Sequence, residues 1–439
     1  MATDNLHYLA ARRRYSVRQF LSWLLFVLVI FLLINAALPR LEMLLFSGTV
    51  PIPSIAIKMG IIFTVYALAG INNRIDITRL AIFLLLLGFF IFETAVFTAS
   101  SPYSIVTFIF GYNAMYFLLM LAFLMTNFRS TIDSERAENV FIVISIPLII
   151  LGVFQTLLNL PLIPTRSVDG YFTVLVWNYY GQVRAFSLFE APAYYATFLI
   201  FIGGLFLGKA LTTKRRWKRS IYWLTLVVVI ASEFMVLNRT AIFAFIFALF
   251  VVFAIYRMGY KKINLFLVMM ISFLASIALI VLVPVISGMF PFVFAFKDQS
   301  MLQRYAEWAY WLKTILLSPK SLLFGSGIFQ NSLFPATRMV IIDNMFLAVI
   351  IQVGIVGLMI ILYVIYKVYS ILVERYLYSK TPMAIACIAL FTTWPIFAMF
   401  GTGLNVFPIY AVLPFLFRPD YVGDGKTSNY RLRFIQKTE

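Results

Sequence analysis

The chain has 439 residues, of which 63% are hydrophobic and 12% are charged, and its mean hydropathy is +0.96. These values are typical of polytopic helical membrane proteins and exclude an ordinary soluble fold. The net charge of +18 does not indicate nucleic-acid binding, because the basic residues are concentrated in short breaks between apolar runs.

Cysteine and histidine exclude further classes of site. Cys387 is the single cysteine and lies in an apolar run, so the sequence predicts neither an intrachain disulfide nor a thiolate metal cluster. His7, the single histidine, lies in the polar N-terminal tail, so zinc-dependent hydrolysis is not expected. We therefore expect no cofactor and no metal.

Apolar runs of about 20 residues alternate with charged breaks, which predicts an all-α polytopic integral membrane protein with about twelve transmembrane helices. The whole chain, 1–439, is expected to form this single transmembrane domain. The predicted spans are 19–38, 50–70, 80–98, 104–126, 140–160, 188–208, 221–238, 240–256, 263–287, 342–366, 383–400 and 402–418.

The basic residues set the expected orientation. Four arginines within 12–18 precede the first span, which places the N-terminus in the cytoplasm. Every second break then also lies inside, and these breaks hold most of the 35 Lys and Arg residues, with the densest cluster at 209–220. An even number of spans also makes the tail 419–439 cytoplasmic.

Two periplasmic loops are longer than simple turns, at 161–187 and 288–341. Positive loops normally stay inside, so the basic character of the second loop indicates an anionic ligand on the outer face. Its basic residues are Lys297, Arg304, Lys313, Lys320 and Arg338.

Arg239 is expected in a tight hairpin at the outer membrane surface. The cytoplasmic residues Arg219 and Arg257 are so close in sequence that two spans use all the residues between them. Arg239 is therefore either a snorkelling residue that ends a hairpin or a functional residue. Glu233 is its candidate ion-pair partner.

Residues 303–319 predict a helix on the outer membrane surface, with Arg304, Trp308 and Trp311 on one stripe. An arginine beside tryptophan suits a sugar phosphate, because the guanidinium forks to phosphate oxygens while the indole stacks on the sugar. The alternative is an ordinary interfacial helix in which Arg304 and Glu307 form an i,i+3 pair.

Other outer residues have both structural and functional interpretations. Gly325 and Gly327 permit a turn whose N–H groups could bind an anion, although most such turns are only turns. Glu190 lies at the outer mouth of a span, where a carboxylate could act as a base or pair with an arginine. Asp343 or Asn344 could simply cap the helix that follows.

The outer arginines are more informative together than singly. No nucleotide motif, metal cluster or serine–histidine pair accompanies them. A lipid-linked diphosphate sugar is already activated and already outside, and arginines would stabilise the charge that develops on its pyrophosphate without a metal. These arginines are Arg166, Arg184, Arg239, Arg304 and Arg338.

Short segments of the chain resemble the bacterial O-antigen polymerase and O-antigen ligase superfamily over roughly residues 185–360. They occur in the family's order, and the spans before them match in hydropathy alone. The segments are FEAPAYYA (189–196), LNRTA (237–241), RYAEW with the downstream FGSGIF (304–329), and DNMFLAVIIQVGIVGL (343–358).

The resemblance implies a metal-independent, inverting membrane glycosyltransferase with a GT-C-like fold in the bacterial inner membrane. It would take a glycan from undecaprenyl diphosphate at the periplasmic face. Ligases of this family typically carry a histidine just before the helix where this chain has Asp343. That departure favours the polymerase branch, in which the acceptor is the next lipid-linked repeat unit of an O-antigen or exopolysaccharide.

The resemblance also implies roles for the site residues. Arg239, Arg304 and Arg338 would bind the two diphosphates, and Arg166 and Arg184 would hold the acceptor or the growing chain. The base is left open among three carboxylates, Glu190, Glu307 and Asp343. The remaining expected substrate contacts are Trp308, Trp311, Gly325, Gly327 and Asn344.

The expected partners are the undecaprenyl-diphosphate-linked donor and acceptor, membrane lipids and a chain-length regulator protein, with no nucleic acid. Two alternatives stay open. One is an O-antigen ligase that acts on lipid A core. The other is a lipid-linked oligosaccharide flippase, which should show two related halves and charges near mid-membrane.

Overall fold

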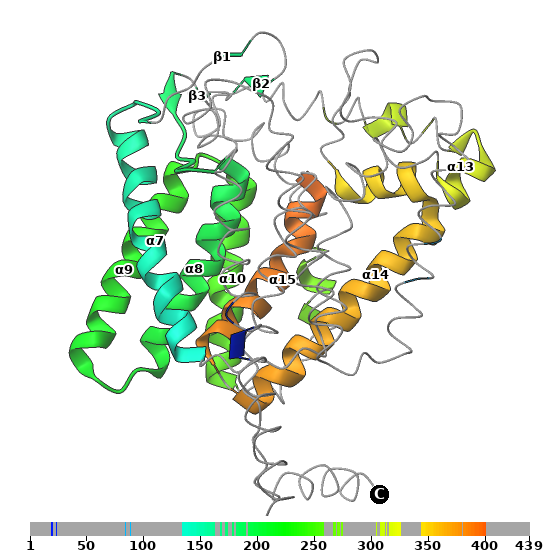
Figure 1. Cartoon of the computed structure of the whole chain (residues 1–439). Helices are drawn as coiled ribbons and strands as arrows, with labels where there is room; N and C mark the ends of the chain where they lie inside the picture. The colour runs from blue at the N-terminus through cyan, green and yellow to red at the C-terminus, as the bar shows by residue number, and fades with distance from the viewer. Residues whose placement is uncertain are drawn as a thin grey trace, which may run out of the picture.

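The computed structural model shows a bundle of long helices, with the short strands and one short helix at the same end (Figure 1). The structure describes residues 19–20, 23, 84, 88, 134–162, 167–168, 172–173, 178–179, 181–189, 192–258, 267–268, 270–272, 274, 304, 308–311, 313, 316–325, 344–379 and 381–400.

In this described part of the chain, six long helices lie where the sequence predicts spans. Their bounds are α7 Ser134–Leu157, α8 Pro192–Thr212, α9 Arg216–Met235, α10 Arg239–Met258, α14 Met345–Ser379 and α15 Pro382–Phe400. The predicted starts of α7 and α9 are too late, because the helices include charged turns that hydropathy assigns to loops. The predicted spans 19–38, 50–70, 80–98, 104–126, 263–287 and 402–418 lie wholly or largely outside the described residues.

Among the described residues, four helical segments are long and apolar enough to cross a membrane. The helical character expected in this part of the chain is therefore confirmed, and so are four of the six spans predicted there, whereas α9 is not among these four and α15 contains only a shorter apolar helix. These segments are Glu135–Leu157, Pro192–Thr212, Arg239–Arg257 and Met345–Ser370, with Pro382–Ala398 a shorter apolar helix.

The region predicted as the loop 161–187 contains short strands, which an all-α prediction does not include. They are β1 Ser167–Val168 with β2 Phe172–Thr173, and β3 Asn178–Tyr179 with β4 Gln182–Val183, each pair antiparallel.

Helix α8 is the centre of the described bundle, because most of its residues are buried. It packs against α9, α10 and α15. The Gly204-xxx-Gly208 face of α8 meets Pro382 and Ala386 of α15, where a Cβ built on either glycine would lie 3.1 Å from an α15 Cα. Small residues at this spacing let helix backbones approach closely, which is a main source of packing energy inside a membrane.

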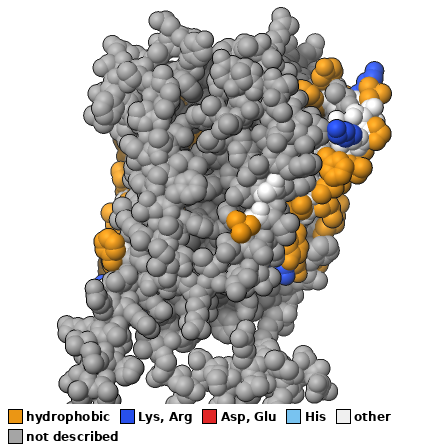
Figure 2. Space-filling model, turned by 45° about the vertical axis from the view of Figure 1, so that its right-hand side comes forward, with side chains coloured by type: hydrophobic (Ala, Val, Ile, Leu, Met, Phe, Trp, Pro, Cys, Tyr) orange, Lys and Arg blue, Asp and Glu red, His pale blue; other side chains and the backbone are white. Residues whose placement is uncertain are grey.

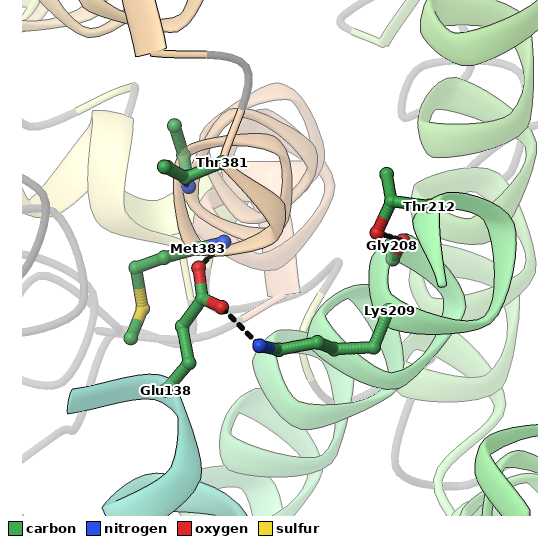
Figure 3. A network of polar contacts seen from close by, with 7 residues as sticks. Glu138, Gly208, Lys209, Thr212, Thr381 and Met383 are labelled. Carbon is green, nitrogen blue, oxygen red and sulfur yellow. Dashed lines mark hydrogen bonds and ion pairs between the residues drawn. The ribbon is translucent and has the colours of Figure 1, made fainter. Parts of the chain in front are cut away.

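A buried ion pair ties three helices together at one end of the bundle (Figure 3). Lys209 Nζ of α8 lies 2.5 Å from Glu138 Oε2 of α7, and the other oxygen of Glu138 accepts a hydrogen bond from Met383 N of α15 at 3.1 Å. Glu138 is 2% exposed and Lys209 is 8% exposed. Both charges are therefore compensated inside the protein rather than by water.

The two ends of the bundle separate the segments as the alternation of spans predicts. The start of α7, the end of α8 and the start of α15 meet at the ion-pair end, together with the basic turn 213–215 between α8 and α9. The end of α7, the α9–α10 turn and α13 (Pro319–Phe324) lie at the opposite end (Figure 1). We call this opposite end the outer end, after the outer face on which the sequence predicts these segments.

Helix α14 is bent, a feature that the predicted span at 342–366 does not include. Gly354 has φ 68° and ψ −175°, a conformation that essentially only glycine adopts. Figure 1 shows the first part of α14 running across the outer end before the helix turns down along the bundle. The bend divides its 35 residues into a short outer segment and a long apolar one.

Large apolar side chains are exposed along the outside of the bundle. Figure 2 shows hydrophobic side chains gathered along the side that carries α13 and α14, with Lys or Arg side chains near the outer end. Exposed apolar side chains on α7, α9, α10 and α14 include Val143, Phe154, Leu224, Phe250 and Met359. A belt of this kind suits contact with lipid chains.

Candidate functional site

The LNRTA segment forms the turn between α9 and α10 at the outer end. Leu237 has φ 54°, a left-handed conformation that is unfavourable for a non-glycine residue. Asn238 caps α10, because its Oδ1 accepts a hydrogen bond from Ala241 N at 3.3 Å. Arg239 is then the first residue of the helix. The expected tight hairpin at Arg239 is confirmed. Leu237 makes the turn, Asn238 caps the helix that follows, and Arg239 begins that helix.

A segment without regular secondary structure over most of its length, residues 183–189, lies against this hairpin, and we call it the outer strap. Ala185 N donates to Met235 O at 3.0 Å, and Arg184 Nε donates to Val236 O at 2.9 Å. Two arginines that are far apart in sequence, Arg184 and Arg239, are therefore brought to the same hairpin. The sequence assigned them to different ligands and did not predict this contact.

The predicted ion pair between Glu233 and Arg239 is wrong. Glu233 is 1% exposed, and among the described residues neither of its carboxylate oxygens has a hydrogen-bond partner. Arg239 begins α10 across the turn with a half-buried side chain. The neighbouring Ser232 Oγ is hydrogen-bonded to Tyr195 Oη of α8 at 2.8 Å, so this face of α9 points into the bundle.

The predicted helix at 303–319 is helical at Arg304, 308–311, Lys313 and Leu316, the described positions before 317. Trp308 belongs to the main hydrophobic core, and Trp311 packs against that core. Arg304 is half-buried one turn before Trp308. The tryptophan stripe therefore faces the protein, while Tyr310, Leu316 and Leu317 are exposed.

Helix α13 follows this segment and packs against the bend of α14. Gly325 has φ 82°, and a Cβ there would strike the backbone of Gln352. A Cβ on Gly354 would strike the carbonyl of Leu323. Two of the segments that carry the family resemblance, FGSGIF and QVGIVGL, are therefore in backbone contact.

The N–H group of Gly325 cannot bind an anion in the way that the sequence suggests. This group donates to Ser321 O at 2.8 Å, and the residue is buried. Gly325 is required because two backbones meet, which leaves no room for a side chain.

Asn344 caps α14, as its structural interpretation predicts. Its Oδ1 accepts a hydrogen bond from Leu347 N at 3.0 Å, and its side chain is buried. A side chain in this role satisfies one of the free N–H groups at the helix start.

Three of the described long helices begin at the outer end, and none of them has an acidic residue in its first turn. These helices are α8, α10 and α14. A helix start carries a partial positive charge, and the guanidinium groups of Arg184 and Arg239 add to it. Among the described residues, these helix starts and the two arginines therefore place positive charge at the outer end, which is compatible with an anionic ligand.

Six of the predicted site residues lie outside the described residues, so their predicted roles stay predictions. They are Arg166, Glu190, Glu307, Gly327, Arg338 and Asp343.

Sequence reasoning missed two residues that support the site, Gln155 and Asn159 at the end of α7. Gln155 bonds to the outer strap, and Asn159 bonds to Gly181 O and Val183 N at 3.0 and 2.7 Å. An isolated glutamine in an apolar span was a usable signal, since a buried amide inside a membrane protein needs partners. Asn159 just after the last apolar residues of α7 was another, because asparagine tolerates its φ of 53°.

Within the part of the chain that the structure describes, no group of three or more His, Cys, Asp or Glu side chains is placed to hold a metal ion. A scan against protein-family models found no match to the chain, and a search of curated proteins found no significant match.

Proposed function

We propose that this chain is an inner-membrane glycosyltransferase that polymerises undecaprenyl-diphosphate-linked repeat units at the periplasmic face. The growing glycan would be transferred from its lipid carrier onto the next lipid-linked unit. The chain would cross the membrane about twelve times, in the expected orientation with both termini in the cytoplasm.

One observation supports this proposal above the others. Two backbone contacts lie at the same end of the bundle, in or directly beside the segments that resemble the polymerase family. Met235, just before LNRTA, contacts Ala185 of the outer strap, which precedes FEAPAYYA, and Gly325 of FGSGIF approaches the backbone of Gln352 at the bend of α14. Segments that lie between residues 185 and 352 are thus gathered at the end of the bundle that the charge pattern predicts to be outer.

The chemistry that follows is a single displacement with inversion. An acceptor hydroxyl attacks the anomeric carbon of the donor sugar, and the bond between that carbon and the diphosphate oxygen breaks. The proton of the hydroxyl passes to a carboxylate, for which Glu190, Glu307 and Asp343 are the candidates. Undecaprenyl diphosphate leaves with the bonding electrons.

The arginines would act on the leaving group. Guanidinium groups pair with phosphate oxygens through two parallel N–H donors, and they stay charged throughout. Removing a donor that stabilises developing negative charge typically lowers kcat by about 10²–10³-fold. Arg239, Arg304 and Arg338 would bind the diphosphates. Because Arg184 is bonded to the hairpin of Arg239, it would act beside them.

Two rivals remain, and they predict different products. A flippase would bind the lipid-linked unit and move it without lengthening the glycan. A ligase would transfer a glycan to lipid A core and would not lengthen the lipid-linked unit.

The deciding experiment uses the purified chain in lipid nanodiscs with undecaprenyl-diphosphate repeat units and no nucleotide. A ladder of longer glycans is the expected result, and Arg304→Ala should abolish it. Arg216→Ala is the matched control, because Arg216 is exposed at the opposite end of the bundle. Binding without any ladder, or transfer to added lipid A core alone, would overturn the polymerase.

A further inference from the structure

The centre of the outer strap is buried although it has no regular secondary structure. Ala185, Phe186 and Ser187 are each 0% exposed, and Ser187 has φ 51°. Buried backbone groups that lack a helix or sheet partner must bond to something else, and a left-handed serine persists only when its surroundings hold it.

The side-chain amide of Gln155 in α7 forms hydrogen bonds with the strap backbone, and it uses both of its donors and both of its acceptor positions. Its Oε1 accepts from Phe186 N at 3.1 Å and from Ser187 N at 2.7 Å. Its Nε2 donates to Ser187 O at 2.9 Å and to Pro161 O at 2.8 Å. A glutamine amide has two donors and two acceptor positions, so its capacity is used completely.

This arrangement specifies glutamine rather than any polar residue of similar size. Two backbone N–H groups face one side of the amide and two carbonyl oxygens face the other, which also fixes the orientation of the amide. A glutamate at this position would set an oxygen against two carbonyl oxygens and would lose both donors.

The strap is held on its other side by the hairpin, through Ala185 N and Arg184 Nε. Ser187 Oγ also donates to Leu148 O of α7 at 2.7 Å. Gln155 is 0% exposed and cannot itself reach a ligand. Its effect on the outer end must therefore pass through the strap.

We propose that Gln155 is a positioning residue, which sets the location of Arg184 against the α9–α10 hairpin by fixing the outer strap. The functional part of this inference rests on the proposed polymerase, whereas the structural part does not.

The first test measures hydrogen exchange of peptides that cover the strap, in the full-length protein. Gln155→Glu should accelerate exchange at residues 186–187 by about tenfold or more, because the oxygen that replaces Nε2 repels the carbonyl oxygens of Ser187 and Pro161 and so displaces the strap from its place against α7. Ser145→Ala is the matched control, since Ser145 is buried on the same helix and its hydroxyl bonds to Ile142 O within that helix. Unchanged exchange at 186–187 in Gln155→Glu would overturn the proposal.

The second test asks whether Gln155 acts through Arg184. Gln155→Glu should lower kcat/KM for ladder formation, and it should lower it no further in an Arg184→Ala background. Losses that multiply in the double variant would refute action through Arg184. If Gln155→Glu does not fold, Asn159→Gly replaces it, because glycine tolerates the φ of residue 159 while the contacts to 181 and 183 are lost.

The two proposals fail in different ways. A wild-type protein that makes no ladder refutes the polymerase. The structural role of Gln155 can then still be tested by hydrogen exchange, which needs no activity. A wild-type protein that makes a ladder, together with a Gln155→Glu variant of normal kcat/KM, refutes the positioning role alone.

Discussion

The buried ion pair between Glu138 and Lys209 gives the most quantitative prediction. Replacing Lys209 with Met removes the cation and leaves Glu138, which is 2% exposed, with a single hydrogen bond from Met383 N. Breaking a buried pair by removing one member typically costs about 3–5 kcal/mol. We expect Lys209→Met to lower the free energy of unfolding by that amount.

The reverse substitution should cost less. Lys209 lies in the last turn of α8, where a long side chain whose partner is lost can extend its ammonium towards water. We therefore expect Glu138→Gln to cost about 1–3 kcal/mol, the usual penalty for an unmade buried hydrogen bond.

The double variant Glu138→Gln with Lys209→Met should recover most of the loss. It contains no charge at either position, and the glutamine amide oxygen would still accept the hydrogen bond from Met383 N. Replacement of a buried pair by neutral groups is often neutral, so we expect stability within about 1 kcal/mol of wild type.

The assay is reversible unfolding in mixed micelles with increasing SDS, followed by tryptophan fluorescence. Lys214→Met is the control, because Lys214 is exposed and should change stability by less than about 0.5 kcal/mol. If the two single losses simply add in the double variant, the side chains do not interact and the account of this end of the bundle is wrong.

Three further predictions concern other contacts of the described bundle. Gly204→Leu should destabilise the protein by about 1–3 kcal/mol in the same assay, because a Cβ at this position would already lie 3.1 Å from Ala386 Cα and the larger side chain would push α8 and α15 apart. Unchanged stability would show that this contact is not formed. Leu237→Val should cost more stability than Leu237→Asn, since a β-branched residue tolerates the φ of 54° poorly and asparagine tolerates it well, and equal losses would contradict the turn. Asn344→Ala should cost about 0.5–2 kcal/mol as a lost helix cap, while Asn344→Asp retains the cap; a ladder lost in both variants without a stability change would instead indicate substrate contact.

Hydropathy predicted where the helices lie because each span is a local property of the chain. The limits of α10 and α15 agree with the expected spans to within a few residues. The tight hairpin at Arg239 was predicted correctly by counting residues between two basic clusters, which needs no tertiary information. The charged first turns of α7 and α9 were missed, since hydropathy cannot distinguish a polar helical turn from a loop.

Features that depend on contacts between distant segments could not be predicted in this way. The bend at Gly354 exists because the carbonyl of Leu323 approaches it, and nothing within α14 alone indicates that neighbour. The partner chosen for Arg239 was wrong because the sequence does not show which face of α9 turns inward at Glu233. Gln155 was overlooked because three of its four bonds join α7 to the outer strap, a segment that meets it only after folding.

The sequence does contain one signal for the close contact of α8 with α15. Gly204 and Gly208 have the spacing of small residues at helix interfaces in membranes. That pattern indicates a close neighbour but does not identify it, and Pro382 and Ala386 become visible as its partners only in the structure.

The central claim is that the end of the bundle carrying Arg184 and Arg239 opens to the periplasm. Single cysteines at Gln182 and Lys214, both exposed and at opposite ends, can be introduced into a Cys387→Ser background. A membrane-impermeant maleimide applied to spheroplasts should label Gln182→Cys directly and label Lys214→Cys only after the membrane is opened. Labelling in the opposite order would contradict the account, because the arginines would then face the cytosol.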